Sequence, residues 1–308
     1  MSGHRIDVSR TAGGIPVVAE TMPGSQSAGF MIAAATGSRD EHPGIFGLSH
    51  LLEHTVFRET RTRDSYQMAK EIEGAGGEIN AFTGREMTAF YGITIRETAD
   101  VAMDIVGDIV ANPTISDKDT ELEKKIVLQE LNMIKNEPES YIHDLFESQL
   151  WRGHPLSQDE GGDEAVVEGL ASSDLRAYYE EKYRIPNLSV YAVGAVDIDS
   201  TTAWAEEALD GMSGGRRNPR SPPKTPEGSY RFVKNDADHY QIAMGFPAYG
   251  AAHRDRTAVS MLSAVLGSGT SSRLFQSVRE KRALVYSVFT SVSQCSDASS
   301  VTAYMSCT

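Results

Sequence analysis

The strongest constraint on the fold is a repeat, because the same order of predicted elements occurs twice along the chain. Each copy begins with a short apolar run bounded by turn residues, continues with two segments of helical periodicity and ends with two strand-like segments. The corresponding segments are 29–35, 45–57, 66–74, 78–83 and 88–95 in the first copy and 240–246, 257–266, 272–281, 285–292 and 300–306 in the second. This internal duplication predicts an α+β fold of two homologous domains, each an antiparallel-rich sheet covered by helices in the manner of an α/β sandwich.

A segment rich in proline and glycine separates the two copies. Residues 211–228 contain four prolines and four glycines, a composition typical of an extended linker. We therefore expect an N-terminal domain at 1–210 and a partial C-terminal domain at 229–308. Because the second copy is much shorter than the first, we also expect the second domain to be incomplete and the chain to be a C-terminally truncated form of a longer one.

Composition excludes several classes of protein. The 308 residues carry a net charge of −14 and show no basic stripe, so we expect no nucleic acid partner. No run of about 20 apolar residues is present, and the first residues do not resemble a secretory signal, so we expect no membrane partner. The only two cysteines, Cys295 and Cys307, exclude a disulfide scaffold, and a reducing, cytoplasmic location follows.

A pair of histidines lies in the first helical segment, within His50-Leu51-Leu52-Glu53-His54. At helical spacing, His50, Glu53 and His54 share one face within roughly 100° of arc, and the two leucines point away into the core. A single histidine on an amphipathic helix is usually only a partly buried structural residue. Two imidazoles one turn apart, with a carboxylate beside them, instead favour binding of one metal ion.

A second helical segment, running from about Lys118 to Lys135, offers the missing ligand. Its candidates are Glu121, Glu123 and Glu130, of which Glu123 and Glu130 are seven residues apart and therefore lie on one partly apolar face of this helix. Two carboxylates are costly to bury without a partner. A metal ion would bind Glu130, and Glu123 would lie next to a ligand residue and help to orient it.

These residues together predict a catalytic zinc centre, with one zinc ion per chain held by His50, His54 and Glu130. A catalytic zinc ion takes three protein ligands and leaves one position for water, whose pKa it lowers. Glu53 is predicted to accept the proton of that water and to deliver it to the leaving amine.

The motif His-x-x-Glu-His is the inverted zinc motif, and the chain resembles the pitrilysin, insulysin and mitochondrial processing peptidase family over essentially its whole length. In that family a glutamate about 76 residues after the second histidine is the third ligand, and another glutamate precedes it by seven; Glu130 and Glu123 match both spacings. The resemblance implies a zinc metalloendopeptidase of the short, two-domain type that hydrolyses peptides or unfolded and precursor proteins.

The resemblance also implies where a substrate binds. Segment 76–83 resembles the strand at which the family adds a peptide substrate to a sheet edge, so Asn80, Ala81, Phe82 and Thr83 are predicted substrate contacts. Arg279 and Tyr286 match a substrate-gripping pair. In the shorter family members each chain forms half of a clam-shell, so we expect a homodimer or a heterodimer with a related chain, in which this pair acts on the partner's zinc site.

Two other hypotheses remain open. The chain is alternatively a non-catalytic scaffold or partner subunit of the same family, although such members usually lose motif residues and this chain keeps them. A mononuclear iron oxygenase also uses two histidines and one carboxylate. The intervening Glu53 and the predicted peptide-binding strand argue against that third hypothesis.

Overall fold

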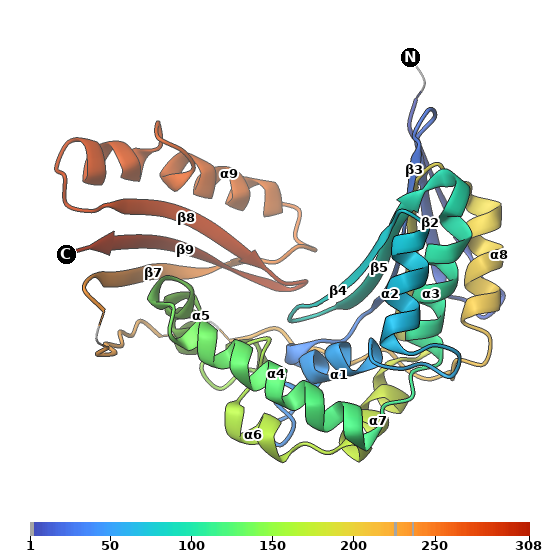
Figure 1. The fold of residues 1–308 in the computed structure, drawn as a ribbon. Helices are drawn as coiled ribbons and strands as arrows, with labels where there is room; N and C mark the ends of the chain where they lie inside the picture. The colour runs from blue at the N-terminus through green and yellow to red at the C-terminus, as the bar shows by residue number, and fades with distance from the viewer. Residues whose placement is uncertain (1–2, 225–226, 236) are drawn as a thin grey trace. The chain divides into compact units, whose positions relative to one another are not determined.

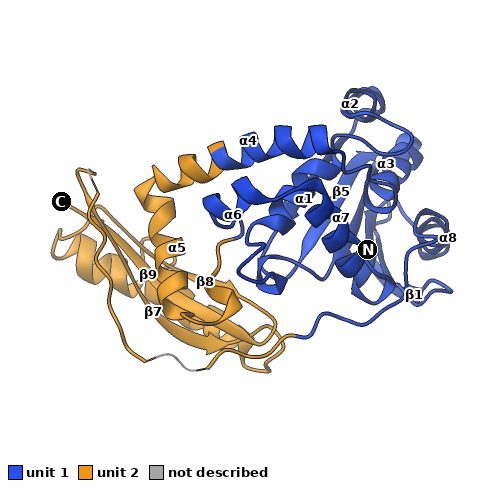
Figure 2. Ribbon diagram, turned by 90° about the horizontal axis from the view of Figure 1, so that it is seen from below, with its two compact units in different colours: residues 1–128, 160–219 blue, residues 129–159, 220–308 orange. Residues whose placement is uncertain are grey.

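The computed structural model describes residues 3–224, 227–235 and 237–308 (Figure 1). Contacts between residues divide the chain into two compact units (Figure 2). Unit 1 comprises Met1–Leu128 and Glu160–Pro219, and unit 2 comprises Gln129–Asp159 and Arg220–Thr308. The division falls inside one continuous helix, α4 (Asp117–Lys135).

Unit 1 is built on a six-stranded sheet in which the strand order is β1-β2-β6-β3-β5-β4. Its strands are β1 (Arg5–Arg10), β2 (Pro16–Thr21), β3 (Ser27–Ala34), β4 (Glu78–Thr83), β5 (Thr88–Ile95) and β6 (Leu188–Gly194). Only β2 and β6 pair in parallel, and the other neighbours are antiparallel. β4 lies at one edge of the sheet and pairs with β5 alone, from Glu78 opposite Ile93 to Thr83 opposite Thr88.

Three helices of unit 1 cover one face of this sheet (Figure 1). They are α2 (Ser65–Gly74), α3 (Ala99–Ala111) and α8 (Ile198–Ala208). Strand side chains alternate between the two faces. In β6, Val190 and Ala192 are therefore buried beneath the helices, whereas Tyr191 and Val193 are exposed on the other face. The core of unit 1 thus lies between one sheet face and these helices.

The remaining helices of unit 1 are α1 (Leu48–Val56), α6 (Glu164–Gly169), α7 (Ser172–Lys182) and the first part of α4. α1 lies at the β4 end of the sheet, in contact with β4 and α7. Its apolar residues Leu48, Leu51 and Leu52 are fully buried. α1 is therefore held firmly by its packing, with one face left for other contacts.

Unit 2 contains a three-stranded antiparallel sheet in the order β7-β9-β8. Its elements are α5 (Pro138–Leu150), β7 (Tyr240–Tyr249), α9 (Arg256–Gly267), a π-helical turn (Phe275–Glu280), β8 (Ser287–Gln294) and β9 (Ala298–Cys307). On one sheet face Ser263 of α9 donates a hydrogen bond to Thr290 of β8 (Oγ–Oγ1 3.0 Å). On the other face Phe146 of α5 closely approaches Gly245 of β7. One helix therefore packs on each side of this sheet.

The predicted mixed fold of sheets and helices is confirmed, and the duplication has a clear structural counterpart. The strand order β3-β5-β4 of unit 1 matches β7-β9-β8 of unit 2, and a helix follows the first strand in both. Strand β1 was not predicted. In β1 only Ile6 and Val8 are apolar, and both are exposed, so this short edge strand lacks the apolar run by which the buried strands were recognised.

Segment 272–281 is only partly the predicted helix, because its regular part is the π-helical turn Phe275–Glu280. The boundaries 1–210, 211–228 and 229–308 stay a prediction. The compact units place 129–159 with the C-terminal residues, and residues 225 and 226 of the predicted linker lie outside the described part of the chain. Within the described ranges, no helix is long and apolar enough to cross a membrane.

Candidate metal centre

Helix α1 presents the predicted motif on one of its faces. His50, Glu53 and His54 are each partly buried, whereas Leu51 and Leu52 are fully buried on the opposite side. The two imidazole rings lie edge to face, with their centroids 4.6 Å apart and their planes at 83°. The helix therefore presents both rings side by side, as its one-turn spacing predicts.

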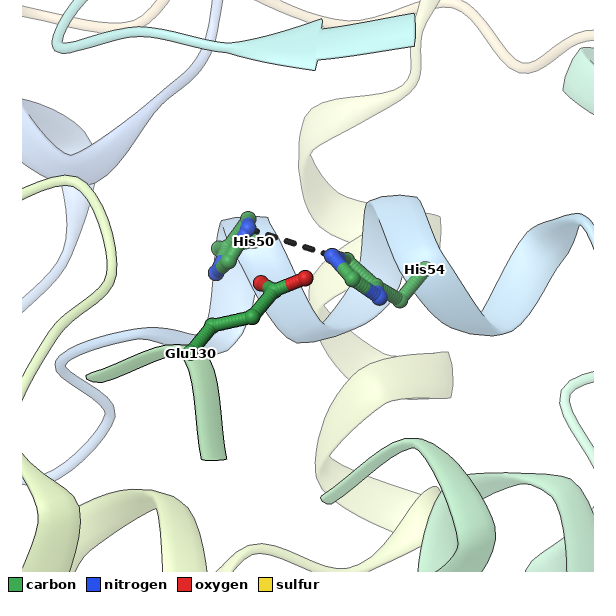
Figure 3. A group of neighbouring side chains, drawn as sticks. All are labelled: His50, His54 and Glu130. Carbon is green, nitrogen blue, oxygen red and sulfur yellow. Dashed lines mark hydrogen bonds between the residues drawn. The ribbon is translucent and has the colours of Figure 1, made fainter. Parts of the chain in front are cut away.

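The side chain of Glu130 points between these two rings (Figure 3). One nitrogen of each ring and one carboxylate oxygen of Glu130 all lie within 4.8 Å of one another, and the two Nε2 atoms are 3.2 Å apart. Tetrahedral zinc, with bonds of about 2.0–2.1 Å, separates its ligand atoms by roughly 3.3 Å. Two imidazole nitrogens and a carboxylate oxygen at these separations fit a zinc ion in donor type and in spacing.

Glu123 lies behind one of the rings and fixes its orientation. Its Oε2 is 3.0 Å from Nδ1 of His54, and its Oε1 accepts a hydrogen bond from Nε of Arg58. Burial of Glu123 acts to raise the pKa of its carboxyl, but the hydrogen bonds from His54 and Arg58 outweigh it and lower the pKa. An ionised Glu123 accepts a hydrogen bond from Nδ1–H of His54, and in this tautomer Nε2 of His54 carries the lone pair that can bind a metal.

The carboxylate of Glu53 is oriented by the end of β4. Thr83 donates a hydrogen bond from Oγ1 to Oε2 of Glu53 over 2.6 Å. Because both groups are partly buried, this bond restricts the rotamers open to Glu53. The hydroxyl of Thr83 is thus placed against the predicted base, while the sequence had suggested only a substrate contact.

The other predicted substrate contacts on β4 alternate between the two sheet faces. Asn80 and Phe82 are exposed, Phe82 to 42%, whereas Ala81 and Thr83 are half-buried. The Oδ1 of Asn80 accepts a hydrogen bond from the backbone N–H of Ala81 over 2.8 Å. β4 is therefore both the edge strand of the sheet and, through Thr83, the strand that orients Glu53.

Arg279 and Tyr286 lie in unit 2, where the structure brings them together. The guanidinium carbon of Arg279 is 5.7 Å from the centre of the Tyr286 ring and 4.7 Å from that of Phe275. Tyr286 is 82% exposed. These contacts are of the cation–π type. That the pair acts on the zinc site of a partner chain stays a prediction.

Arg58 is the residue of this centre that sequence reasoning missed. It follows His54 by four residues, one helical turn further along the chain, although α1 itself ends at Val56. That spacing is the only sequence signal for it, and charged residues at this spacing on helix surfaces are common. Its role depends on Glu123, which is 65 residues away in sequence.

Known families match both halves of the chain. Residues 16–163 match the family described as insulinase (peptidase family M16), and residues 170–308 match the one described as peptidase M16 inactive domain. Uncharacterized zinc proteases are among the similar proteins. One from Streptomyces coelicolor is 33% identical over 96% of this chain and 66% of its own length, and one from Mycobacterium tuberculosis is 34% identical over 96% and 68%. The chain therefore spans about two thirds of the length of these curated relatives.

Solved structures show the same fold. A protease from Helicobacter pylori superposes with a TM-score of 0.92 at 20% identity, over 99% of this chain and 76% of its own. A peptidase M16 inactive domain from Pseudomonas fluorescens gives a TM-score of 0.92 at 18% identity, over 98% and 74%. The sequence matches above, to the family model and to relatives at 33–34% identity, show that the chain belongs to the insulinase family, peptidase family M16.

Proposed function

We propose that the chain forms the catalytic part of a zinc-dependent endopeptidase that hydrolyses peptides or unfolded and precursor proteins. The observation that carries this proposal is the group formed by His50, His54 and Glu130, whose ligand atoms lie within 4.8 Å of one another. The names of the relatives, which are uncharacterized zinc proteases, support the choice of zinc and of protease chemistry.

Each residue of the centre has a defined task in this proposal. When bound, a zinc ion supplies Lewis acidity toward water and toward the scissile carbonyl. Glu53, oriented by the Thr83 hydroxyl, accepts a proton from the attacking water and delivers it to the leaving amine. Glu123 holds the His54 ring so that Nε2 faces the ligand group, and Arg58 holds Glu123.

The free edge of β4 supports an extended peptide as the substrate. An added strand would pair with the backbone of β4 and would depend little on sequence, since main-chain hydrogen bonds provide the affinity. Phe82 would offer an apolar contact for a side chain of that peptide. Unfolded segments and peptides are the expected substrates, because most of the backbone of a folded protein is already paired within its own structure.

The C-terminal half is assigned to substrate or partner contacts. Among the described residues, only His50, His54 and Glu130 form a group that fits a metal ion, and the C-terminal half matches a family described as inactive. We therefore place the chemistry in the first half and retain Arg279 and Tyr286 as proposed substrate contacts. The dimer and the cytoplasmic location stay predictions, and analytical ultracentrifugation of the purified chain tests the first of them.

The decisive experiment replaces the proposed base. Glu53→Gln should retain bound zinc and lower cleavage of a peptide library by at least about a hundredfold, because the amide cannot accept a proton. Glu97→Gln, an exposed carboxylate in a turn, is the control and should cleave like the unmodified chain. Retained cleavage in Glu53→Gln would remove the assigned base, and an unmodified chain without zinc would remove the metal centre itself.

A further inference from the structure

Helix α1 has no side-chain hydrogen bond from its N-cap residue. Residue Gly47 occupies the N-cap position of α1 with a left-handed backbone (φ 96°). A Cβ at this position would lie 2.6 Å from Cγ2 of Val167 and 2.7 Å from the carbonyl oxygen of Gly161, so only glycine fits. Glycine has no side-chain acceptor for the free amides of the first turn. Those amides must therefore find their acceptor elsewhere.

A buried glutamate from an earlier segment supplies that acceptor. Glu41 is 5% exposed, and its two carboxylate oxygens accept one backbone hydrogen bond each: Oε2 from the N–H of Gly47 (2.8 Å) and Oε1 from the N–H of Ser49 (2.6 Å). The first turn of α1 contains no acidic residue of its own. Glu41 thus supplies both the acceptors and the negative charge that the start of a helix favours.

A second contact ties the same turn to the neighbouring helix. The hydroxyl of Tyr178, on α7, lies 2.7 Å from Oγ of Ser49 and 2.9 Å from Oγ1 of Thr36. Ser49 therefore meets Glu41 through its backbone and Tyr178 through its side chain. We name Glu41, Ser49 and Tyr178 the α1 clamp.

We propose that the α1 clamp is a positioning device for the metal ligands, with Glu41 as its principal residue. Ser49 directly precedes His50, so the clamp holds the backbone one residue before the first ligand. α1 has only nine residues, and helices this short are not stable by themselves. A ligand set must be held within about 0.5 Å to bind its metal well, and a clamp on the first turn limits the rotation and sliding of the helix that carries two of three ligands.

The inference rests on the proposed zinc centre. Zinc affinities of different variants test the positioning role of Glu41 and the zinc centre separately. Glu41→Gln keeps one carbonyl oxygen but turns an NH₂ group toward a backbone N–H, so one capping bond is lost. We expect its zinc dissociation constant, measured at pH 8 by competition with a chelator, to rise about tenfold, as for other residues that orient metal ligands. We also expect kcat to fall more than KM changes.

A matched control separates positioning from a general loss of stability. Glu147 is a buried glutamate of unit 2, 6% exposed, and its carboxylate accepts hydrogen bonds from Trp151 and Ser300. Glu147→Gln removes a comparable buried carboxylate far from α1 in sequence and should leave the zinc dissociation constant within about twofold. Equal zinc affinity in Glu41→Gln and Glu147→Gln would overturn the positioning role while leaving the metal centre in place.

Two further variants keep the test decisive. If Glu41→Gln does not fold, Tyr178→Phe removes the hydroxyl that contacts Ser49 and Thr36 and leaves the backbone bonds to Glu41 in place. It should weaken zinc binding about threefold, and unchanged affinity in that variant would overturn the inference. His54→Ala reports on the proposed function alone. If it binds zinc as tightly as the unmodified chain, the ligand assignment fails, whatever the clamp variants show.

Discussion

Helices α1 and α9 occupy the same place in the two copies of the repeat but carry different chemistry. Each follows one strand and precedes the other two of a matching three-strand arrangement, β3-β5-β4 in unit 1 and β7-β9-β8 in unit 2. α1 carries His50, Glu53 and His54, whereas the middle of α9 presents Met261 and Leu262, which are both exposed. Topology is therefore shared, and function depends on the side chains placed upon it.

The two helices also begin differently. The N-cap residue of α1 is the left-handed Gly47, and the carboxylate of Glu41, from an earlier segment, caps the helix. The N-cap residue of α9 is Asp255, whose backbone is not left-handed and whose side chain makes no cap hydrogen bond. The buried clamp thus accompanies the helix that carries the ligands, which is the difference expected if it serves the metal centre.

The largest expected effect follows from removing a ligand. His54→Ala should lower zinc affinity by more than about a hundredfold, because two protein ligands do not hold the ion as three do. His143→Ala, in unit 2, should leave zinc content unchanged. Zinc analysis of both purified variants compares their metal content. Loss of zinc in His143→Ala would contradict the placement of the metal site at α1.

The pH dependence of stability should distinguish the clamp from other buried groups. Burial raises the pKa of Glu41 to about 7, although hydrogen bonds from Ser49 and Gly47 act to lower it. The folded chain therefore binds this proton more tightly than the unfolded chain does. Its contribution to stability is fully present below the unfolded pKa of about 4.5 and is lost as the pH rises through 7, a change of roughly 3 kcal/mol.

Urea unfolding of the unmodified chain and of Glu41→Gln between pH 4.5 and 8 measures this contribution. The difference between their unfolding free energies should decrease steadily up to pH 7 and then level off. Parallel curves over the whole range would show that Glu41 does not titrate in this window. Ionised Glu41 lowers the free energy of unfolding, yet it is the form that accepts both capping hydrogen bonds. Zinc affinity, and not stability, is therefore the measure of the positioning role of Glu41.

A smaller effect is expected from the group behind the metal ligands. Glu123→Gln keeps an acceptor near Nδ1 of His54 but loses the charge that attracts both that ring and Arg58. We expect zinc affinity to fall about tenfold. Isothermal titration with zinc measures it, and Glu121→Gln, on the exposed side of α4, is the control. Affinity equal to that of the control would show that His54 is oriented by other contacts.

The smallest effect should come from the exposed side of α9. Met261 is 64% exposed, so Met261→Gln should change the unfolding free energy by less than about 0.5 kcal/mol. Leu51→Ala in the corresponding helix α1 should cost about 2–5 kcal/mol, since that leucine is fully buried. Similar losses in both variants would mean that α9 is covered in solution and would weaken the contrast between the two helices.

Local patterns in the sequence accounted for most elements and for the residues of the motif. The helix containing His50 and His54, the edge strand at 78–83 and the antiparallel strand after it were all predictable, because their signals are short-range periodicities. Strand β1 and the π-helical turn were not predicted. β1 has only two apolar residues, Ile6 and Val8, and a π-helix does not follow the regular α-helical repeat. Glu130 was predicted because it shares a helical face with Glu123, and its spacing from His54 in the family resemblance supported that choice.

What the sequence alone determined is which side chains share one helical face: His50 with His54 on α1, and Glu123 with Glu130 on α4. Those relations follow from the helical repeat and need no other part of the chain. The tertiary structure decided which distant groups orient them, namely Arg58 on Glu123, Thr83 on Glu53 and Glu41 on the start of α1. These contacts join residues from 6 to 65 positions apart. They arise from packing between separate segments, whose geometry no local pattern encodes.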